Sequence, residues 1–493
     1  MTSLLAKIFT SHAVLQRGVP IPIYGNAAAS TLVDASFGGV TMHGIADATG
    51  RWTVEFPAMT AGGPFVIFAN SSTGATAQIT DVYSGDLILC GGQSNMDMPV
   101  SYAFNSSAEA AAAAAYPLLR YVTVTSNYSS TPLFEFGNIS SWEIPTPASS
   151  LEFSAVCWYA VRDTFDALRA AGEGEVAMGM IHSALGGTAI QEWQNAVGAA
   201  ACPLAQPPIY PTFSRLYNAM IAPFVLNHFR ISHVIFYQGE QNVIQNAYYA
   251  CMLTALSDSW QADFSLRGDG SNGNGRFFVA QLHAWNASVI PGNVDFYGAV
   301  AAQRLAQAAG VAASPGSELA TAIDGGDPLA PETSIHPRNK QLPGFRLAQA
   351  IVARRYGLNI AYAAPRYASS SASTSGAQLT VSIVLSGNAG LIFKPPTPDS
   401  KSTRCPTDLT VPLFMCAAFE IMLDDAPFPN GTWVSAAAVV DAPGTGITLT
   451  ATATTQGQKA AGSRNGWAAW PIVNIYTLDG NLPVLPWIEP VTQ

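Results

Sequence analysis

The stretch Leu87-Ile88-Leu89-Cys90-Gly91-Gly92-Gln93-Ser94-Asn95-Met96 decides how this chain is read. Its first four residues form a continuous apolar run, which is typical of a strand buried in a parallel sheet. Two glycines follow, and they allow the chain to turn sharply. The turn would present Ser94 at the carboxyl end of the strand, where open α/β sheets form their sites. Ser94 is therefore a candidate nucleophile, and capping of a following helix is the alternative.

The pattern around this stretch alternates between helices and buried strands. Apolar runs predict strands, and apolar residues at helical spacing predict the helices between them. The predicted strands cover residues 176–181, 234–237 and 277–282, and the predicted helices cover residues 109–115, 153–171, 216–228 and 343–356. This alternation predicts a three-layer α/β fold with a parallel sheet over residues 84–360.

The two flanks of the chain lack the helical period. Residues 51–56 alternate between apolar and polar side chains, and glycine pairs punctuate the region before residue 84. Residues 378–383 alternate in the same way. We therefore expect an N-terminal β-domain over residues 1–83 and a C-terminal β-domain over residues 361–493. We find no internal repeat.

Length and charge exclude several classes of protein. The chain has 493 residues, which indicates two to four domains. Its formal net charge is -10, so no basic surface is available for nucleic acid. No run of 18 or more strongly apolar residues is uninterrupted, so we expect no membrane insertion.

Asparagine sequons and cysteines indicate a secretory protein. The six sequons are those at Asn70, Asn105, Asn127, Asn138, Asn286 and Asn430. We expect a secreted, lysosomal or endomembrane glycoprotein whose signal peptide is not in this sequence. A cytoplasmic protein with accidental sequons is the alternative.

The six cysteines allow 15 pairings. Cys405 and Cys416 are close enough in sequence to close one local loop. Cys90 and Cys157 lie in apolar runs, so we expect them to be buried free thiols. A bridge between Cys202 and Cys251 is an open alternative.

Three further segments carry residues suited to ester chemistry. Backbone N–H groups at Gly187, in a Gly-Gly-Thr turn, are candidates to bind a developing oxyanion. Gln238 follows a predicted strand and is a second candidate donor, and Glu240 is a candidate to orient a neighbour or a sugar hydroxyl. His336 is the candidate base, since imidazole is the usual base for a serine nucleophile. An ordinary turn or a structural histidine is the alternative for each segment.

The sequence lacks the Cys and His spacing of a zinc site. It also lacks the glycine-rich loop, with its lysine, that binds phosphates. We therefore expect no metal and no nucleotide cofactor.

Taken together, four motifs resemble the sialate O-acetylesterases, a family of SGNH/GDSL hydrolases. They are Gly-Gln-Ser-Asn-Met at residues 92–96, Gly-Gly-Thr at 186–188, Tyr-Gln-Gly-Glu at 237–240 and Ser-Ile-His-Pro-Arg at 334–338. Flanking similarities extend from residues 14–18 to residues 481–483, and so reach both β-domains. The resemblance implies a flavodoxin-like catalytic domain of the SGNH type.

The resemblance also implies roles for individual residues. Ser94 matches the nucleophile and His336 the catalytic histidine, while the N–H groups of Ser94 and Gly187 and the Gln238 amide match the oxyanion donors. Many SGNH enzymes carry an Asp two or three residues before the histidine, but Thr333 and Ser334 stand there in this chain.

The acidic member of the triad therefore stays open. Asp324 and Asp327 are the candidates, with Glu332 behind them, and a Ser–His dyad is the alternative. The implied reaction removes 9-O- or 4-O-acetyl groups from sialic acid and releases acetate. An acetyl esterase acting on xylan or another glycan, and an inactive glycan-binding protein, are the competing interpretations.

Overall fold

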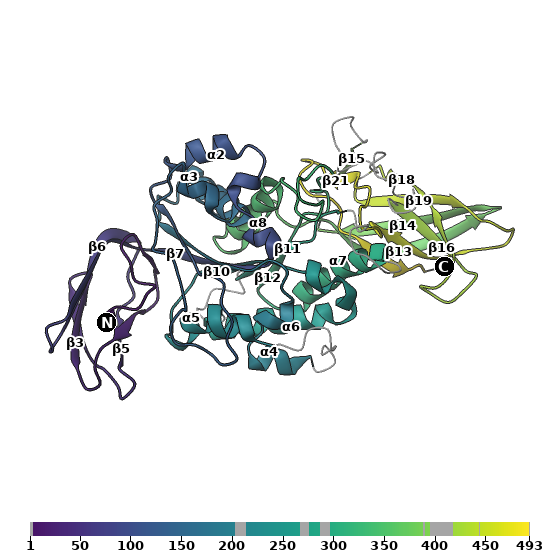
Figure 1. The fold of residues 1–493 in the computed structure, drawn as a ribbon. Helices are drawn as coiled ribbons and strands as arrows, with labels where there is room; N and C mark the ends of the chain where they lie inside the picture. Colours follow the sequence, from purple (N-terminus) through teal and green to yellow (C-terminus); the bar gives the residue numbers. More distant parts are fainter. Residues whose placement is uncertain are drawn as a thin grey trace.

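The structure is a computed structural model that describes residues 3–202, 213–266, 276–285, 296–387, 390–394, 418–442 and 444–492. Figure 1 shows a central sheet between two layers of helices, with β-sheets beyond each end of it. The predicted mixed α/β architecture with a large central sheet and additional β-sheets is confirmed.

Six parallel strands form the central sheet. Their spatial order is β8 (Leu119–Thr123), β9 (Met178–Ala184), β7 (Thr76–Gly92), β10 (His233–Tyr237), β11 (Phe277–Gln281) and β12 (Ser317–Thr321). All residues of β9, β10 and β11 are buried. This burial explains why these strands are continuous apolar runs rather than alternating ones.

Alternate residues of β7 face the two helical layers. Leu87 and Leu89 lie in the core that includes Trp260 of α6 (Asn246–Asp263), whereas Ile88 and Cys90 lie in the core that includes Trp158 of α3 (Ala155–Ala170). Because successive side chains of a strand point to opposite faces, both layers pack on the same four residues.

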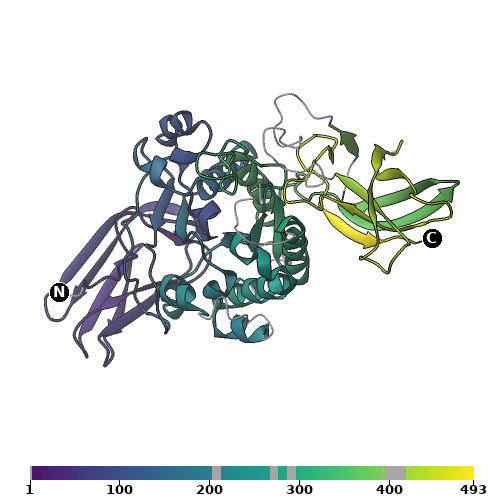
Figure 2. The same cartoon turned by 45° about the vertical axis from the view of Figure 1, so that its right-hand side comes forward.

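The helices lie on both faces of this sheet (Figures 1 and 2). One layer contains α2 (Ser106–Ala113), α3 (Ala155–Ala170) and α8 (Gln341–Arg354), and the other contains α4 (Ala196–Ala201), α5 (Ala222–Leu226), α6 (Asn246–Asp263) and α7 (Phe296–Ala313). The predicted helix at 216–228 is divided into a π-helical turn, Tyr217–Ile221, and α5.

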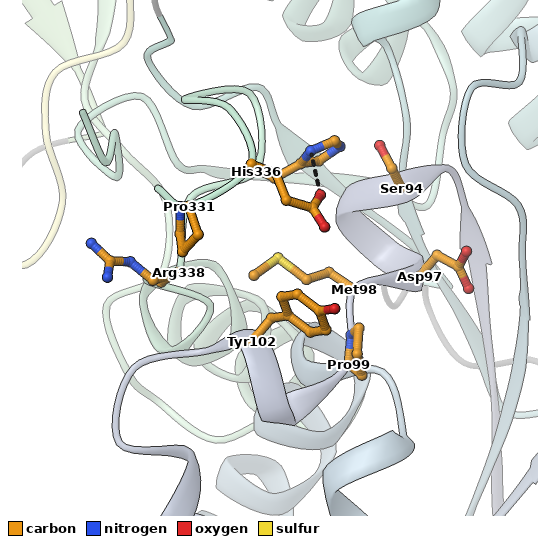
Figure 3. A pocket seen from close by; sticks show the side chains of 9 residues that line it. Ser94, Asp97, Met98, Pro99, Tyr102, Pro331, His336 and Arg338 are labelled. Carbon is orange, nitrogen blue, oxygen red and sulfur yellow. Dashed lines mark ion pairs between the residues drawn. The ribbon is translucent and has the colours of Figure 1, made fainter. Parts of the chain in front are cut away.

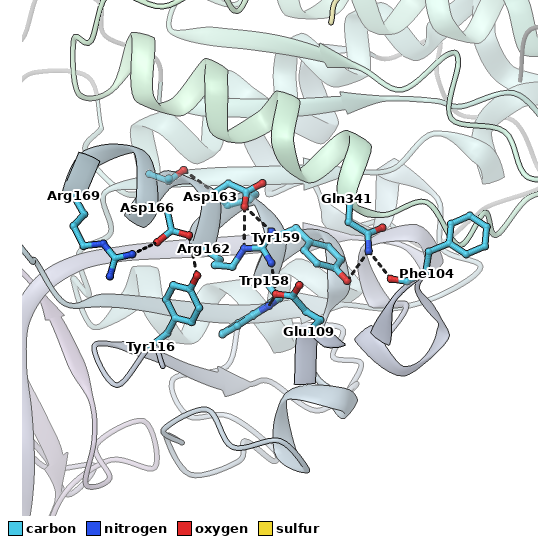
Figure 4. Close-up of polar contacts among 12 residues, drawn as sticks. Phe104, Glu109, Tyr116, Trp158, Tyr159, Arg162, Asp163, Asp166, Arg169 and Gln341 are labelled. Atoms are coloured by element: carbon cyan, nitrogen blue, oxygen red, sulfur yellow. Dashed lines mark hydrogen bonds and ion pairs between the residues drawn. The ribbon is translucent and has the colours of Figure 1, made fainter. Parts of the chain in front are cut away.

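Polar contacts join α3 to its neighbours (Figure 4). Glu109 of α2 accepts hydrogen bonds from Arg162 and from the Trp158 indole of α3. Gln341, at the start of α8, donates to the Tyr159 hydroxyl and to the Phe104 carbonyl. These contacts fix the start of α8, and with it the segment that precedes α8.

The N-terminal strands continue directly into the central sheet, because β7 serves both. Its first half pairs antiparallel with β6 (Gly62–Ser71) and parallel with β1 (Val14–Gln16). The sheet continues through β3 (Leu32–Phe37) to β4 (Val40–Ile45), while β2 (Ile21–Asn26) and β5 (Arg51–Phe56) pair with each other. The boundary predicted between residues 83 and 84 lies inside β7, and the division into three domains stays a prediction.

The C-terminal part consists of antiparallel strands. One sheet has the order β13 (Arg366–Ser375), β14 (Gln378–Ser386), β19 (Gly446–Thr452) and β18 (Ala437–Val440). The second has the order β17 (Trp433–Ser435), β16 (Phe419–Leu423), β20 (Ala460–Asn465) and β22 (Trp487–Pro490), and β15 (Leu391–Phe393) pairs with β21 (Ile475–Thr477). Alternate residues of β14 are buried, as the alternation at 378–383 predicts.

Two disulfides correct the cysteine predictions. Cys90 of β7 and Cys157 of α3 are bonded, with a Cα–Cα distance of 5.9 Å, so the prediction of two free thiols is wrong. Both side chains are buried, as their apolar surroundings indicate, but only the packing of α3 on β7 brings the two sulfurs together. The Cys202–Cys251 bridge, left open by the sequence, is present. Cys405 and Cys416 lie outside the described residues.

Candidate active site

Ser94 follows a turn whose backbone only glycine fits. Gly92 has φ +143°, and a Cβ built on it would lie 2.1 Å from the carbonyl oxygen of Tyr237. The turn leads into α1 (Ser94–Asp97), with Ser94 half-buried at its first position. The sequence thus places a serine at the carboxyl end of β7, as the opening stretch predicts.

Ser94 and His336 line the same pocket, a cavity of about 160 Å³. His336 lies in the segment between β12 and α8, residues 322–340, which we call the histidine segment. Figure 3 shows its imidazole extending toward Ser94 at the start of α1. The pocket also contains Asp97, Glu332 and Arg338. The two residues that the sequence singles out for catalysis, 242 positions apart in the chain (336 − 94), therefore share one cavity.

The carboxylate nearest the His336 ring is that of Glu332. The distance from His336 Nδ1 to Glu332 Oε2 is 3.6 Å, and the Glu332 side chain is 60% exposed. Burial and the positive charge of Lys340 lower the pKa of His336, and Glu332 opposes them. A lowered pKa keeps the imidazole neutral, which is the form that accepts a proton.

Asp324 and Asp327 are each held by an arginine, and within the described residues neither forms an ion pair with His336, contrary to the expectation that one of them orients its ring. Asp324 accepts from Arg346 at 2.6 and 2.9 Å, and Asp327 accepts from Arg338 at 2.6 and 3.1 Å. Burial raises the pKa of each carboxyl, but the arginine outweighs it and the net pKa of both is lowered. Both carboxylates are therefore ionised partners within structural ion pairs.

The Gly-Gly-Thr turn lies against Ser94. A Cβ built on Gly186 would be 3.4 Å from Ser94 Cβ, and Gly187 is exposed with φ +71°. The predicted segment is therefore next to the nucleophile, where a backbone N–H group can meet an oxyanion.

Gln238 does not face the pocket, and this corrects its predicted role. Its side chain is fully buried, and its Nε2 lies within 3.0 Å of three acceptors: Gln93 Oε1, Thr188 O and Asn242 Oδ1. Its Oε1 accepts from the Tyr249 hydroxyl. An amide with two N–H groups has none left for a substrate, so Gln238 joins the turns beneath the site.

Glu240 is buried and accepts a hydrogen bond from Asn95 Nδ2 at 2.5 Å. This contact is with a neighbouring side chain, and both roles expected of Glu240 stay predictions. Asn95 also contacts Lys340, and sequence reasoning assigned a role to neither residue. Asn95 lies inside the 92–96 motif, and Lys340 lies two residues after the 334–338 motif. Their positions next to Ser94 and near His336 are the signal that could have found them.

Asp97 and His182 form a second pair that sequence reasoning missed. Asp97 lines the pocket and lies 3.4 Å from His182 Nε2. Burial lowers the pKa of His182 to about 4, so its imidazole is neutral, and burial raises the pKa of Asp97 against the opposing Gly186 N–H.

Within the described residues, no group of three or more His, Cys, Asp or Glu side chains is arranged so that it could hold a metal ion. Nor is any helix in the described part long and apolar enough to cross a bilayer.

The chain is similar to known carbohydrate esterases. Residues 84–268 match a family described as carbohydrate esterase, sialic acid-specific acetylesterase. The sialate O-acetylesterase of Rattus norvegicus is 29% identical over 416 residues, which cover 71% of this chain and 73% of the relative. That of Homo sapiens is 31% identical over 327 residues, covering 62% of this chain and 61% of the relative. The crystal structure of a carbohydrate acetylesterase from Xanthomonas citri is 29% identical, has a TM-score of 0.78 and covers 99% of both chains.

A fold shared over its full length with a carbohydrate acetylesterase, and a family match that spans the Ser94 turn, define this protein as a carbohydrate esterase, an ester hydrolase. Within that class it is similar to the sialate O-acetylesterases, whose family model matches residues 84–268.

Proposed function

We propose that this chain removes O-acetyl groups from sialic acids, with Ser94 as the nucleophile and His336 as the base. The observation that carries the proposal is the cavity that Ser94 and His336 share, next to the Gly186–Gly187 turn. The sialic acid specificity is supported by the family match over residues 84–268 and by the names of the rat and human relatives.

The proposed reaction has two steps. His336 takes the proton of Ser94 Oγ as this oxygen attacks the acetyl carbonyl, and the N–H groups of Ser94 and Gly187 stabilise the oxyanion. His336 then returns the proton to the departing sugar oxygen, which leaves an acetyl-serine. Water gives a proton to His336 and attacks the acetyl carbon. The bond to Ser94 Oγ then breaks, His336 passes its proton to that oxygen, and acetate leaves.

We assign the third position of the triad to Glu332, in place of Asp324 and Asp327. Its carboxylate lies on the Nδ1 side of His336, at 3.6 Å, and no hydrogen-bond partner of Nδ1 is found among the described residues. A carboxylate there stabilises the imidazolium that forms during each step. Because Glu332 is mostly exposed, this stabilisation is weak compared with that from a buried aspartate.

The finer description of the fold supports the same class. Without the edge strand β8, the strands of the parallel sheet have the order β9-β7-β10-β11-β12, which is 2-1-3-4-5 in chain order. This order, with helices on both faces, is that of flavodoxin-like sheets. We infer that the central part is an SGNH-type three-layer domain, between an N-terminal and a C-terminal β-domain.

We also infer that the protein passes through an oxidising compartment and is secreted or lysosomal. Two disulfides are typical of such proteins. Three of the sequon asparagines, Asn105, Asn138 and Asn430, are exposed and so accessible to glycosylation. A shift in mass on enzymatic removal of N-glycans from protein made in a eukaryotic host tests this inference.

A second substrate class is favoured by one comparison: the neighbour from Xanthomonas citri is named a carbohydrate acetylesterase, without mention of sialic acid. We would compare acetate release from O-acetylated sialic acid and from acetylated xylan at matched acetyl concentration. Faster release from sialic acid supports the proposal. Release from xylan alone would keep the mechanism and replace the substrate, and release from neither by folded protein would favour a glycan-binding protein.

A further inference from the structure

Asn95 connects the nucleophile turn to the histidine segment. Its side chain is fully buried, directly after Ser94. Nδ2 donates to the carbonyl of Ile335 at 2.9 Å and to Glu240 Oε1 at 2.5 Å, and Oδ1 accepts from Lys340 Nζ at 2.5 Å. Ile335 immediately precedes His336. One amide thus bonds to the residue before the histidine and to a lysine four residues after it.

Lys340 is an unusual residue for this position, since its side chain has no exposed surface. Burial of an ammonium group costs free energy unless it is paired. Within the described residues no direct ion pair joins Lys340 to a carboxylate, and Asn95 stands between it and Glu240. Packing alone does not explain a buried cation at this position, because an apolar side chain would fill the same space without the cost of burying a charge.

We propose that Asn95 and Lys340 are positioning residues that lock the Ser94 turn to the histidine segment, so that Ser94 and His336 keep the geometry needed for proton transfer. This inference rests on the proposed roles of Ser94 and His336. Asn95 bonds to Ile335, just before His336, and to Lys340, four residues after it. Loss of either bond releases the histidine segment on one side of His336. A displacement of about 1 Å at a reacting centre can reduce the rate on the order of 100-fold.

The charge of Lys340 has a second effect, on the base itself. After burial, Lys340 is the next cause that lowers the pKa of His336, and it also lowers the pKa of His283. Burial lowers the pKa of Lys340 to about 7 against the opposing charges of Glu240 and Asp327, and the Tyr237 ring lies 5.9 Å from Nζ. Burial in turn raises the pKa of Glu240. Below pH 7 Lys340 is therefore charged, in the range where His336 titrates.

Two variants separate the two effects. Asn95→Ala removes the link without changing a charge, and Lys340→Met removes both the link and the cation while keeping a long apolar side chain. The control is Lys459→Met, because Lys459 is exposed on the C-terminal β-domain. Each is assayed with p-nitrophenyl acetate, which reports the ester chemistry whatever the sugar preference, and folding is checked by circular dichroism.

For Asn95→Ala we expect kcat to fall about tenfold or more with KM within about threefold, and the acidic limb of kcat/KM to stay in place. For Lys340→Met we expect a similar loss of kcat and an acidic limb moved to higher pH, because the pKa of His336 rises when the cation is removed. Lys459→Met should match the wild type.

Folded Asn95→Ala and Lys340→Met proteins with kcat within about twofold of the wild type would overturn the inference. If Lys340→Met does not fold, Asn95→Ala alone decides through its kcat and KM. Ser94→Ala is assayed in parallel: activity retained there contradicts the proposed function, whereas its loss together with unchanged Asn95→Ala contradicts only the positioning roles.

Discussion

Replacing Glu332 with glutamine tests the acid member of the proposed triad by the size of its effect as well as its direction. At 3.6 Å the attraction between the carboxylate and an imidazolium is about 1 kcal/mol in a water-like dielectric. We use that value because the Glu332 side chain is 60% exposed, so solvent screens the pair. Since about 1.4 kcal/mol is a factor of ten, Glu332→Gln should lower kcat roughly three- to tenfold.

The same variant should move the pH profile in a defined direction. Glu332 raises the pKa of His336, so its removal lowers that pKa. The acidic limb of kcat/KM should therefore move to lower pH by less than about one unit. Initial rates on p-nitrophenyl acetate from pH 4 to 8 measure both effects, with Glu489→Gln, at an exposed position of β22, as the control. A loss of about 10³-fold or more, or a limb that moves to higher pH, would refute the argument from exposure and distance.

The remaining predictions concern stability and the corrected residues. Loss of the Cys90–Cys157 bridge in a double serine variant should lower the free energy of unfolding by about 4 kcal/mol, since the bridge closes a loop of 67 residues, and denaturant unfolding with and without reductant measures it. Gly92→Ala should abolish soluble, active protein because its Cβ meets the Tyr237 carbonyl, whereas Gly74→Ala, with open space around its Cβ, should cost only about 1 kcal/mol; equal yields of the two variants would contradict this. Asp324→Asn should destabilise the protein by roughly 3–5 kcal/mol by leaving Arg346 unpaired, without moving the acidic limb of kcat/KM. The folded-state pKa of Asp324 is lowered, so the stability that its carboxylate contributes is present above about pH 4 and is lost as the pH falls through the folded-state pKa. Urea unfolding should therefore show a smaller difference in stability between variant and wild type at pH 3 than at pH 7.

The sequence was sufficient to predict those features that depend on neighbours along the chain. The apolar run 87–90 predicts a buried strand because all four side chains pack on helices. The alternation at 378–383 predicts the half-buried strand β14 for the same local reason. Ser94 and His336 could be named because each lies in a motif with a recognisable resemblance.

The predictions that the structure does not support depend on which side chains, distant in sequence, come into contact in the fold. Cys90 and Cys157 are 67 residues apart, and nothing in their apolar surroundings shows that α3 packs over β7 at that point. Asp324 and Asp327 were candidates by proximity in sequence, but each has a closer arginine in space. Gln238 directly follows the expected strand, yet its amide nitrogen is buried beside three acceptors.

Acetate release from O-acetylated sialic acid by wild-type protein and by Ser94→Ala tests the central claim most directly. We predict measurable release by the wild type and a loss on the order of 10³-fold or more in the variant, with unchanged folding and thermal stability. Release by folded Ser94→Ala at a rate close to that of the wild type would contradict the account, since the ester chemistry would then belong to another residue.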